Sequence, residues 1–151
     1  MNKGTQKLIY IATDIITSAA AWAIFFAFRK ISIEQTFFNA DRNFILGIFL
    51  IPVFWQILYH MSGYYNEVFR KSRLKEFFQT FFVTLIGVLI IFFTLLLDDE
   101  IHTYKNYYKT ILTLFSLHFI LTELARVIIT SRTNHLIFNR ILGFNTIIIG
   151  S

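Results

Sequence analysis

Long apolar segments separated by short polar ones make up most of this sequence. Four of them, residues 8–28, 44–65, 77–97 and 107–129, are nearly free of formal charge. A helix needs about 20 mostly apolar residues to cross a hydrocarbon core of about 30 Å, and these segments have that length. Membrane β-strands are about 10 residues long and alternate in polarity, which these segments do not. The pattern therefore predicts an all-α membrane domain of four spans within residues 1–130.

The composition agrees with a membrane protein. Of the 151 residues, 56% are hydrophobic and only 15% are charged, whereas soluble domains average about 45–50% apolar and about 25% charged residues. These values argue against a soluble enzyme and against a disordered chain. The absence of Cys excludes disulfides, thiolate metal sites and a Cys nucleophile. The formal net charge of +5 is spread between the apolar segments, so we expect a lipid bilayer, and no nucleic acid, as partner.

The distribution of Lys and Arg predicts the orientation of the spans. Short cytoplasmic loops are enriched in these two residue types. If both termini face the cytoplasm, nine of the 14 basic residues lie on that side and five on the other. We therefore expect both ends of the chain in the cytoplasm.

The connection between the second and third spans is short and basic. It contains Arg70, Lys71, Arg73 and Lys75, interleaved with apolar residues. Two interpretations remain open: ordinary positive-inside anchoring, and specific contact with anionic lipid headgroups of the cytoplasmic leaflet. Ser72 is a plausible N-cap for the third helix.

Apart from Lys109 at the start of the fourth span, three charged residues lie within predicted spans, where a charge is costly and is a functional candidate by default. Asp14 lies in the first span, and Glu123 and Arg126 are three residues apart on one face of the fourth. Glu123 and Arg126 can pair with each other, and either can reach Asp14 if both termini are on the same side. We expect a structural ion-pair network, with a transport or proton-relay path as the alternative.

The other polar residues do not form a recognisable active-site motif. His60 and His118 are isolated in apolar surroundings, where a hydrogen bond is the expected role. The sequence contains no complete nucleophile–base set, metal motif or phosphate-binding glycine loop, so we assign no catalytic, cofactor-binding or metal residue. The tyrosines all lie near predicted helix ends, which is typical of an aromatic belt at headgroup level. They are Tyr10, Tyr59, Tyr64, Tyr65, Tyr104, Tyr107 and Tyr108.

Residues 131–151 differ from the rest of the chain. They begin with a polar stretch and end in Thr146, three consecutive Ile residues and Gly150-Ser151. An apolar run that enters a glycine turn is typical of a buried parallel strand, such as the first strand of a dinucleotide-binding βαβ unit. We therefore expect a cytoplasmic linker followed by the first strand of a truncated Rossmann-like domain, so that the chain is a fragment of a longer protein.

Several short runs of aromatic, basic and glycine-containing sequence distinguish the chain. They are Trp55, Tyr59, Ser62-Gly63-Tyr64-Tyr65, Arg70-Lys71-Ser72-Arg73, Glu76, Asn106-Tyr107-Tyr108, Ile129-Thr130-Ser131-Arg132, Gly143-Phe144-Asn145-Thr146 and Gly150-Ser151. Together these runs resemble the N-terminal membrane region of bacterial polyprenyl glycosylphosphotransferases, the sugar transferases that begin exopolysaccharide, capsule or O-antigen synthesis. The resemblance covers nearly the whole chain, but its runs are not catalytic signatures.

The resemblance implies a four-helix membrane bundle, a Rossmann-like cytoplasmic domain and a C-terminal catalytic domain. Such an enzyme moves a sugar 1-phosphate from a nucleotide sugar to polyprenyl phosphate and uses Mg²⁺. The acidic catalytic residues of the family belong to the last domain, and none is carried onto this sequence. This chain would then be the anchor in the bacterial inner membrane, with both substrates bound by the missing domains.

Two other functions remain open at this stage. The chain could be a complete flippase-like transporter with a polar path along Asp14, Glu123 and Arg126, or a scaffold subunit that recruits a separate transferase. Small residues such as Gly47 and Gly87 would permit close helix contacts within one chain or between copies in a homo-oligomer.

Overall fold

Helices form the described part of the chain. The computed structural model describes residues 3–33, 35, 37, 40–66, 72–96 and 104–138. The four helices are α1 (Lys3–Phe28), α2 (Arg42–Met61), α3 (Arg73–Ile91) and α4 (Tyr104–Phe138), and the π-helical turns η1 (Arg29–Ile33) and η2 (Phe92–Leu96) prolong α1 and α3. Each of the four is long and apolar enough to be a candidate membrane span, and the predicted number of helices is confirmed among the described residues. The strand expected at the end of the chain lies outside the described residues.

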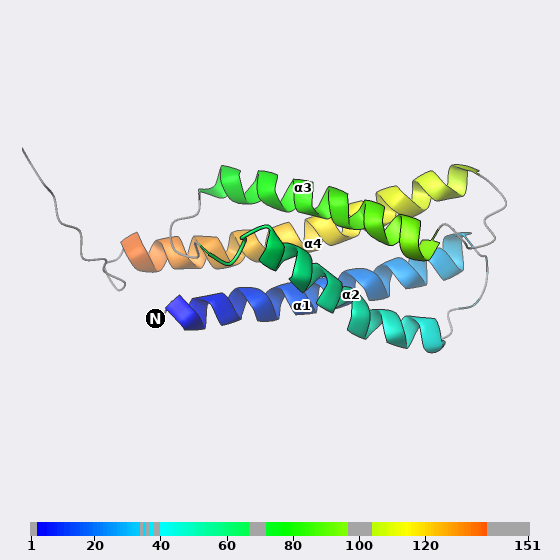
Figure 1. Cartoon of the computed structure of the whole chain (residues 1–151), viewed down its shortest axis with the longest axis horizontal. Coiled ribbons are helices and arrows are strands. Elements are labelled where there is room, and N and C mark those ends of the chain that lie inside the picture. The colour runs from blue at the N-terminus through cyan, green and yellow to red at the C-terminus, as the bar shows by residue number, and fades with distance from the viewer. Residues whose placement is uncertain are drawn as a thin grey trace, which may run out of the picture.

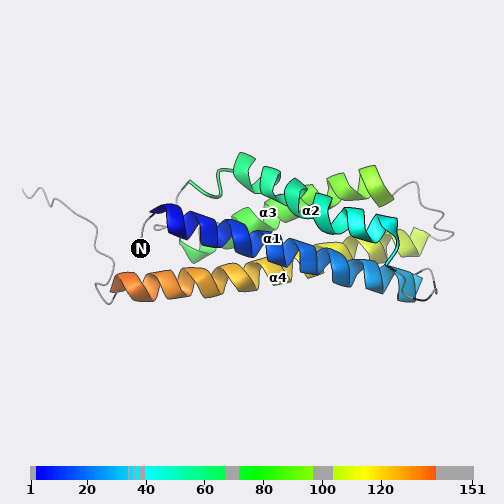
Figure 2. The same cartoon turned by 90° about the horizontal axis from the view of Figure 1, so that it is seen from below.

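The helices form an elongated antiparallel bundle (Figures 1 and 2). α1 packs along both α2 and α4, and α3 packs along α4. α1 begins, α2 ends, α3 begins and α4 ends on the left of Figure 1, and we call this the terminal end of the bundle. The first and last helices therefore reach the same end, as the expectation of two cytoplasmic termini requires.

The exterior of the bundle is apolar, unlike that of a soluble protein, and charged residues lie inside beside a buried aromatic and aliphatic core. Large apolar side chains point outward on all four helices, among them Leu8, Ile16, Phe49, Leu50, Phe82, Phe93, Leu112 and Leu124. Buried positions, in contrast, include Asp14, Glu76 and Arg126. In water such an exterior would be unstable, whereas in a bilayer the lipid tails solvate it. The fold is that of a membrane protein.

Local sequence explains where two helices begin. The Asp41 carboxylate accepts a hydrogen bond from the Phe44 backbone N–H (3.0 Å) and caps α2. The Ser72 hydroxyl accepts from the Lys75 N–H (3.2 Å) and caps α3, which confirms the predicted cap. Each cap satisfies one of the backbone donors that the first turn of a helix leaves unpaired.

Two helix ends differ from the sequence prediction. α2 ends at Met61, and residues 62–66 form a turn in which Gly63 adopts a positive φ of 70°. α4 continues to Phe138, well beyond the predicted end at residue 129. Side-chain contacts with α1 explain this extension, because Gln6 donates a hydrogen bond to the Thr133 hydroxyl at the terminal end.

Two glycines permit close packing between helices. A Cβ on Gly47 would lie 2.0 Å from Nε1 of Trp22, and a Cβ on Gly87 would lie 2.3 Å from Cζ3 of Trp55. Both distances are far shorter than a van der Waals contact. Glycine therefore lets an indole ring from one helix lie directly on the backbone of another.

Candidate functional site

A buried polar cluster joins α1, α3, α4 and the turn after α2 in the half of the bundle next to the terminal end. We call it the Arg126 cluster. Its members are Tyr10, Asp14, Tyr64, Tyr65, Glu76, Thr80, Arg126 and Thr130, all of them buried. α1, α3 and α4 supply six of these residues, and the turn after α2 supplies the two tyrosines.

Arg126 and Asp14 form a two-pronged ion pair at the centre of this cluster. Arg126 Nε donates to Asp14 Oδ1 at 3.0 Å and Nη2 donates to Oδ2 at 2.9 Å. The third nitrogen, Nη1, donates to the Thr80 hydroxyl at 2.9 Å. The two charged side chains are 0% and 1% exposed. This geometry connects α4 to α1 and α3 through charge-assisted hydrogen bonds, which are stronger than neutral ones.

Two aromatic rings lie against the guanidinium group. Its Cζ lies 4.0 Å from the centre of the Tyr59 ring and 3.7 Å from that of the Tyr64 ring. A cation over an aromatic face is attracted by the ring quadrupole, and the attraction is greatest where water is absent. The π faces thus add to the stabilisation that Asp14 gives the buried positive charge.

Glu76 forms a second acidic centre beside the pair. Tyr64 donates its hydroxyl to Glu76 Oε1, and Thr130 donates to Oε2 at 2.7 Å. Because the single hydroxyl proton of Thr130 is directed at Glu76, the Tyr10 hydroxyl donates to the Thr130 oxygen (2.7 Å). These bonds connect α1, α3, α4 and the turn after α2 a second time.

Tyr65 completes the shell of donors around Asp14. Its hydroxyl donates to Asp14 Oδ2 at 2.7 Å. Burial raises the pKa of the Tyr64 and Tyr65 phenols well above their usual range, and the neighbouring carboxylates raise it further. Both phenols therefore stay protonated and act as hydrogen-bond donors to Glu76 and Asp14.

The hydrogen-bonding groups of the Arg126 cluster are directed at one another. All three guanidinium nitrogens of Arg126 donate within the protein, and both oxygens of Glu76 accept. Within the part of the chain that the structure describes, no group of three His, Cys, Asp or Glu residues could hold a metal ion. The arrangement is thus suited to cross-linking helices and offers no free reactive group.

The structure brings some predicted site residues together and separates others. Asp14 and Arg126 pair directly. Glu123 is half-buried on α4, and its buried Oε2 has no hydrogen-bond partner among the described residues. Arg73 and Lys75 are exposed at the start of α3, and Arg73 Nη2 lies 3.4 Å from the Ser131 hydroxyl. Arg70 and Lys71 lie outside the described residues.

The aromatic-belt interpretation is wrong for four tyrosines. Tyr10, Tyr59, Tyr64 and Tyr65 are at most 4% exposed and point into the bundle. Each has a polar partner there, which a belt residue would find in the headgroups. His118 has the hydrogen bond that we expected, because its Nε2 lies 2.8 Å from the Tyr59 hydroxyl.

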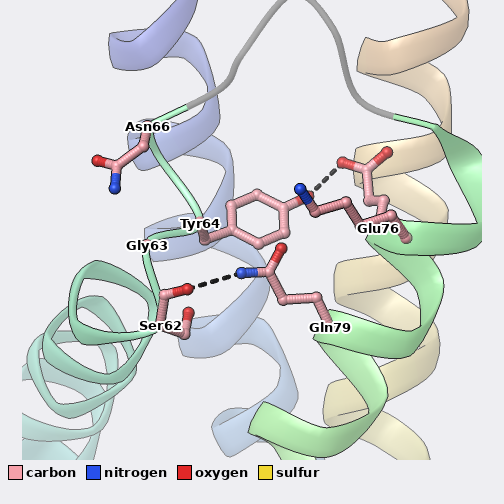
Figure 3. Close-up of a pocket in the computed structure, with 7 residues that line it drawn as sticks. Ser62, Gly63, Tyr64, Asn66, Glu76 and Gln79 are labelled. Atoms are coloured by element: carbon pink, nitrogen blue, oxygen red, sulfur yellow. Dashed lines mark hydrogen bonds between the residues drawn. The ribbon is translucent and has the colours of Figure 1, made fainter.

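A small cavity lies beside the Arg126 cluster at the terminal end (Figure 3). Its volume is about 220 Å³, and the turn after α2 and the first turns of α3 line it. In Figure 3 the Tyr64 ring crosses the view toward Glu76, and Gln79 closes the side nearest α2 by donating to the Ser62 carbonyl at 2.8 Å. The cavity thus lies between two hydrogen bonds that join the turn to α3.

Comparisons of the whole chain with models of protein families, with curated proteins and with solved structures found no match.

Proposed function

We propose that the chain is the membrane domain that anchors a polyprenyl-phosphate sugar-1-phosphate transferase at the cytoplasmic face of the bacterial inner membrane. The observation that carries the proposal is the Arg126 cluster. It is a buried set of helix cross-links next to the end of the bundle at which α1 begins and α4 ends. A bundle fastened at that end is suited to holding an attached domain at the membrane surface.

The sequence resemblance supports the same function through particular residues. Tyr59, Tyr64, Glu76 and Thr130 belong to the runs that resemble polyprenyl glycosylphosphotransferases. In the structure all four lie in or against the Arg126 cluster. Residues that are far apart in the sequence and that carry the resemblance are therefore joined in one feature of the fold.

Anchoring has a physical purpose in such an enzyme. Polyprenyl phosphate stays in the membrane, so a catalytic domain held at the leaflet surface meets it at a high effective concentration. The acceptor, the nucleotide sugar and the Mg²⁺ ion would bind to the domains that follow this one. The role of this chain is retention and orientation, and the Asp14–Arg126 pair has a structural role in it.

The test is a transfer assay on membranes that contain the full gene product. Membranes are incubated with polyprenyl phosphate, Mg²⁺ and a panel of nucleotide sugars labelled with ³²P in the phosphate next to the sugar. We expect ³²P in the lipid extract with at least one sugar, and loss of that signal when Mg²⁺ is chelated. A gene product that gives no labelled lipid with any sugar of the panel would contradict the proposal.

A further inference from the structure

An apolar groove runs along the outer surface of the bundle between α1 and α2. Its volume is about 820 Å³, which is within the range of about 300–1,000 Å³ of small-molecule sites. Its lining residues include Ile11, Ile15 and Ala19 of α1 and Pro52, Val53 and Ile57 of α2. Both helices are candidate membrane spans, so the groove opens toward lipid.

The length of the groove corresponds to one leaflet. On α1 it extends from Lys7 to Ala19, which is about 18 Å at a rise of 1.5 Å per residue. Half of a hydrocarbon core of about 30 Å is about 15 Å. An occupant that fills the groove is therefore an extended chain within one leaflet.

The two ends of the groove differ in charge. Lys7 and His60 lie at the terminal end, and the remaining described lining residues include no acidic side chain. Lys7 is half-buried and lines the groove. A cation at the headgroup level of an apolar groove is complementary to a lipid phosphate.

We propose that this groove binds one chain of an anionic phospholipid, whose phosphate pairs with Lys7. Tyr65 also lines the groove, and its hydroxyl donates to Asp14. A bound lipid therefore packs against a residue that belongs to the Arg126 cluster. The proposal requires that α1 and α2 span a bilayer, and it does not depend on the transferase-anchoring function.

The headgroup contact is tested by native mass spectrometry of the purified full chain in detergent. Phosphatidylglycerol and phosphatidylcholine with identical acyl chains serve as probes. We expect the wild-type protein to bind phosphatidylglycerol more tightly. Lys7→Gln should reduce this preference about fivefold, the loss expected for one basic residue near a lipid surface. Arg132→Gln is the matched control, because Arg132 is an exposed cation near the same end outside the groove lining.

The chain contact is tested by filling the groove. Ala19→Phe places a ring between α1 and α2 and should abolish the binding of both lipids. Ile86→Phe adds a ring to the exposed face of α3 and should leave binding unchanged. An unchanged headgroup preference in Lys7→Gln would overturn the proposal, as would retained phosphatidylglycerol binding in folded Ala19→Phe. The first test is sufficient if Ala19→Phe does not fold.

Discussion

At the residue scale, the stability of the bundle depends on how completely the charge of Arg126 is compensated. Its guanidinium group receives an acidic partner, a hydroxyl acceptor and two aromatic faces. Removing one partner from a buried pair leaves an uncompensated charge, which costs about 3–5 kcal/mol. Single substitutions at Asp14 or Arg126 should therefore lower the free energy of unfolding most.

The first prediction concerns the buried pair. Arg126→Met leaves the Asp14 carboxylate without its cation, and we expect the free energy of unfolding to fall by about 3–5 kcal/mol. The measurement is a denaturation titration in mixed micelles. Arg132→Met removes an exposed arginine from the same helix and should change the free energy by less than about 0.5 kcal/mol. Equal stability of the two variants would show that the pair does not hold the bundle together.

The second prediction concerns the donors around Asp14. Tyr65→Phe removes the hydroxyl that lies 2.7 Å from Asp14 Oδ2, and hydrogen bonds to charged groups are worth about 1.5–3 kcal/mol. The same titration should show a loss of that size. Tyr108→Phe serves as the control, because Tyr108 is 71% exposed. If Tyr65→Phe loses no more unfolding free energy than Tyr108→Phe, the Tyr65 hydroxyl does not stabilise the bundle through Asp14.

At the element scale, hydropathy predicted the four helices but not the ends of α2 and α4. The spans follow from segment length, and the start of α3 follows from Ser72. The end of α2 depends on the backbone of Gly63, and the extension of α4 depends on Gln6 of another helix. Such contacts between distant residues have no periodicity within a single segment, so the sequence pattern did not predict them.

The polar faces of α1, α3 and α4 do have a periodicity that sequence reasoning missed. Buried residues of α1 recur every four positions, as do those of α3 and α4. They are Gln6, Tyr10, Asp14 and Ser18 in α1, Glu76, Thr80 and Thr84 in α3, and His118, Thr122, Arg126 and Thr130 in α4. Polar residues at helical spacing within apolar segments indicate an interior face, because lipid faces the rest of the helix. This spacing could have identified Glu76 and Thr130 as residues of the interior face.

The third prediction tests the packing of α2 on α3. Gly87→Ala places a Cβ about 2.3 Å from the Trp55 ring. That ring cannot move freely, because it stacks on His118 with the ring centres 3.6 Å apart. We expect a loss of about 1–3 kcal/mol in the free energy of unfolding. Gly4→Ala is the matched control, because a Cβ there has no neighbour within 4 Å. A Gly87→Ala variant as stable as Gly4→Ala would contradict the close contact between the two helices.

At the scale of the whole molecule, the sequence predicted the class of fold better than the site. The number of spans follows from the apolar segments, and the expected orientation follows from the distribution of Lys and Arg along the chain. The partners in the Arg126 cluster depend on which helices are neighbours, and the packing of α1 on α4 decides that Asp14 is the partner of Arg126. The sequence left both Glu123 and Asp14 open as partners of Arg126.

The anchor proposal depends on one feature of the molecule: the terminal end of the bundle faces the cytoplasm. Because the chain has no Cys, single cysteines can report on each end without a background. Thr5→Cys and Asn134→Cys place an exposed thiol near the terminal end, and Ala40→Cys and Lys105→Cys place one at the opposite end.

The decisive measurement is the labelling of these four variants with a membrane-impermeant maleimide in intact cells and in lysed cells. We expect the thiols at positions 40 and 105 to react in intact cells, and those at positions 5 and 134 to react only after lysis. Labelling of positions 5 and 134 in intact cells would place the terminal end outside the cytoplasm and would contradict the anchor proposal.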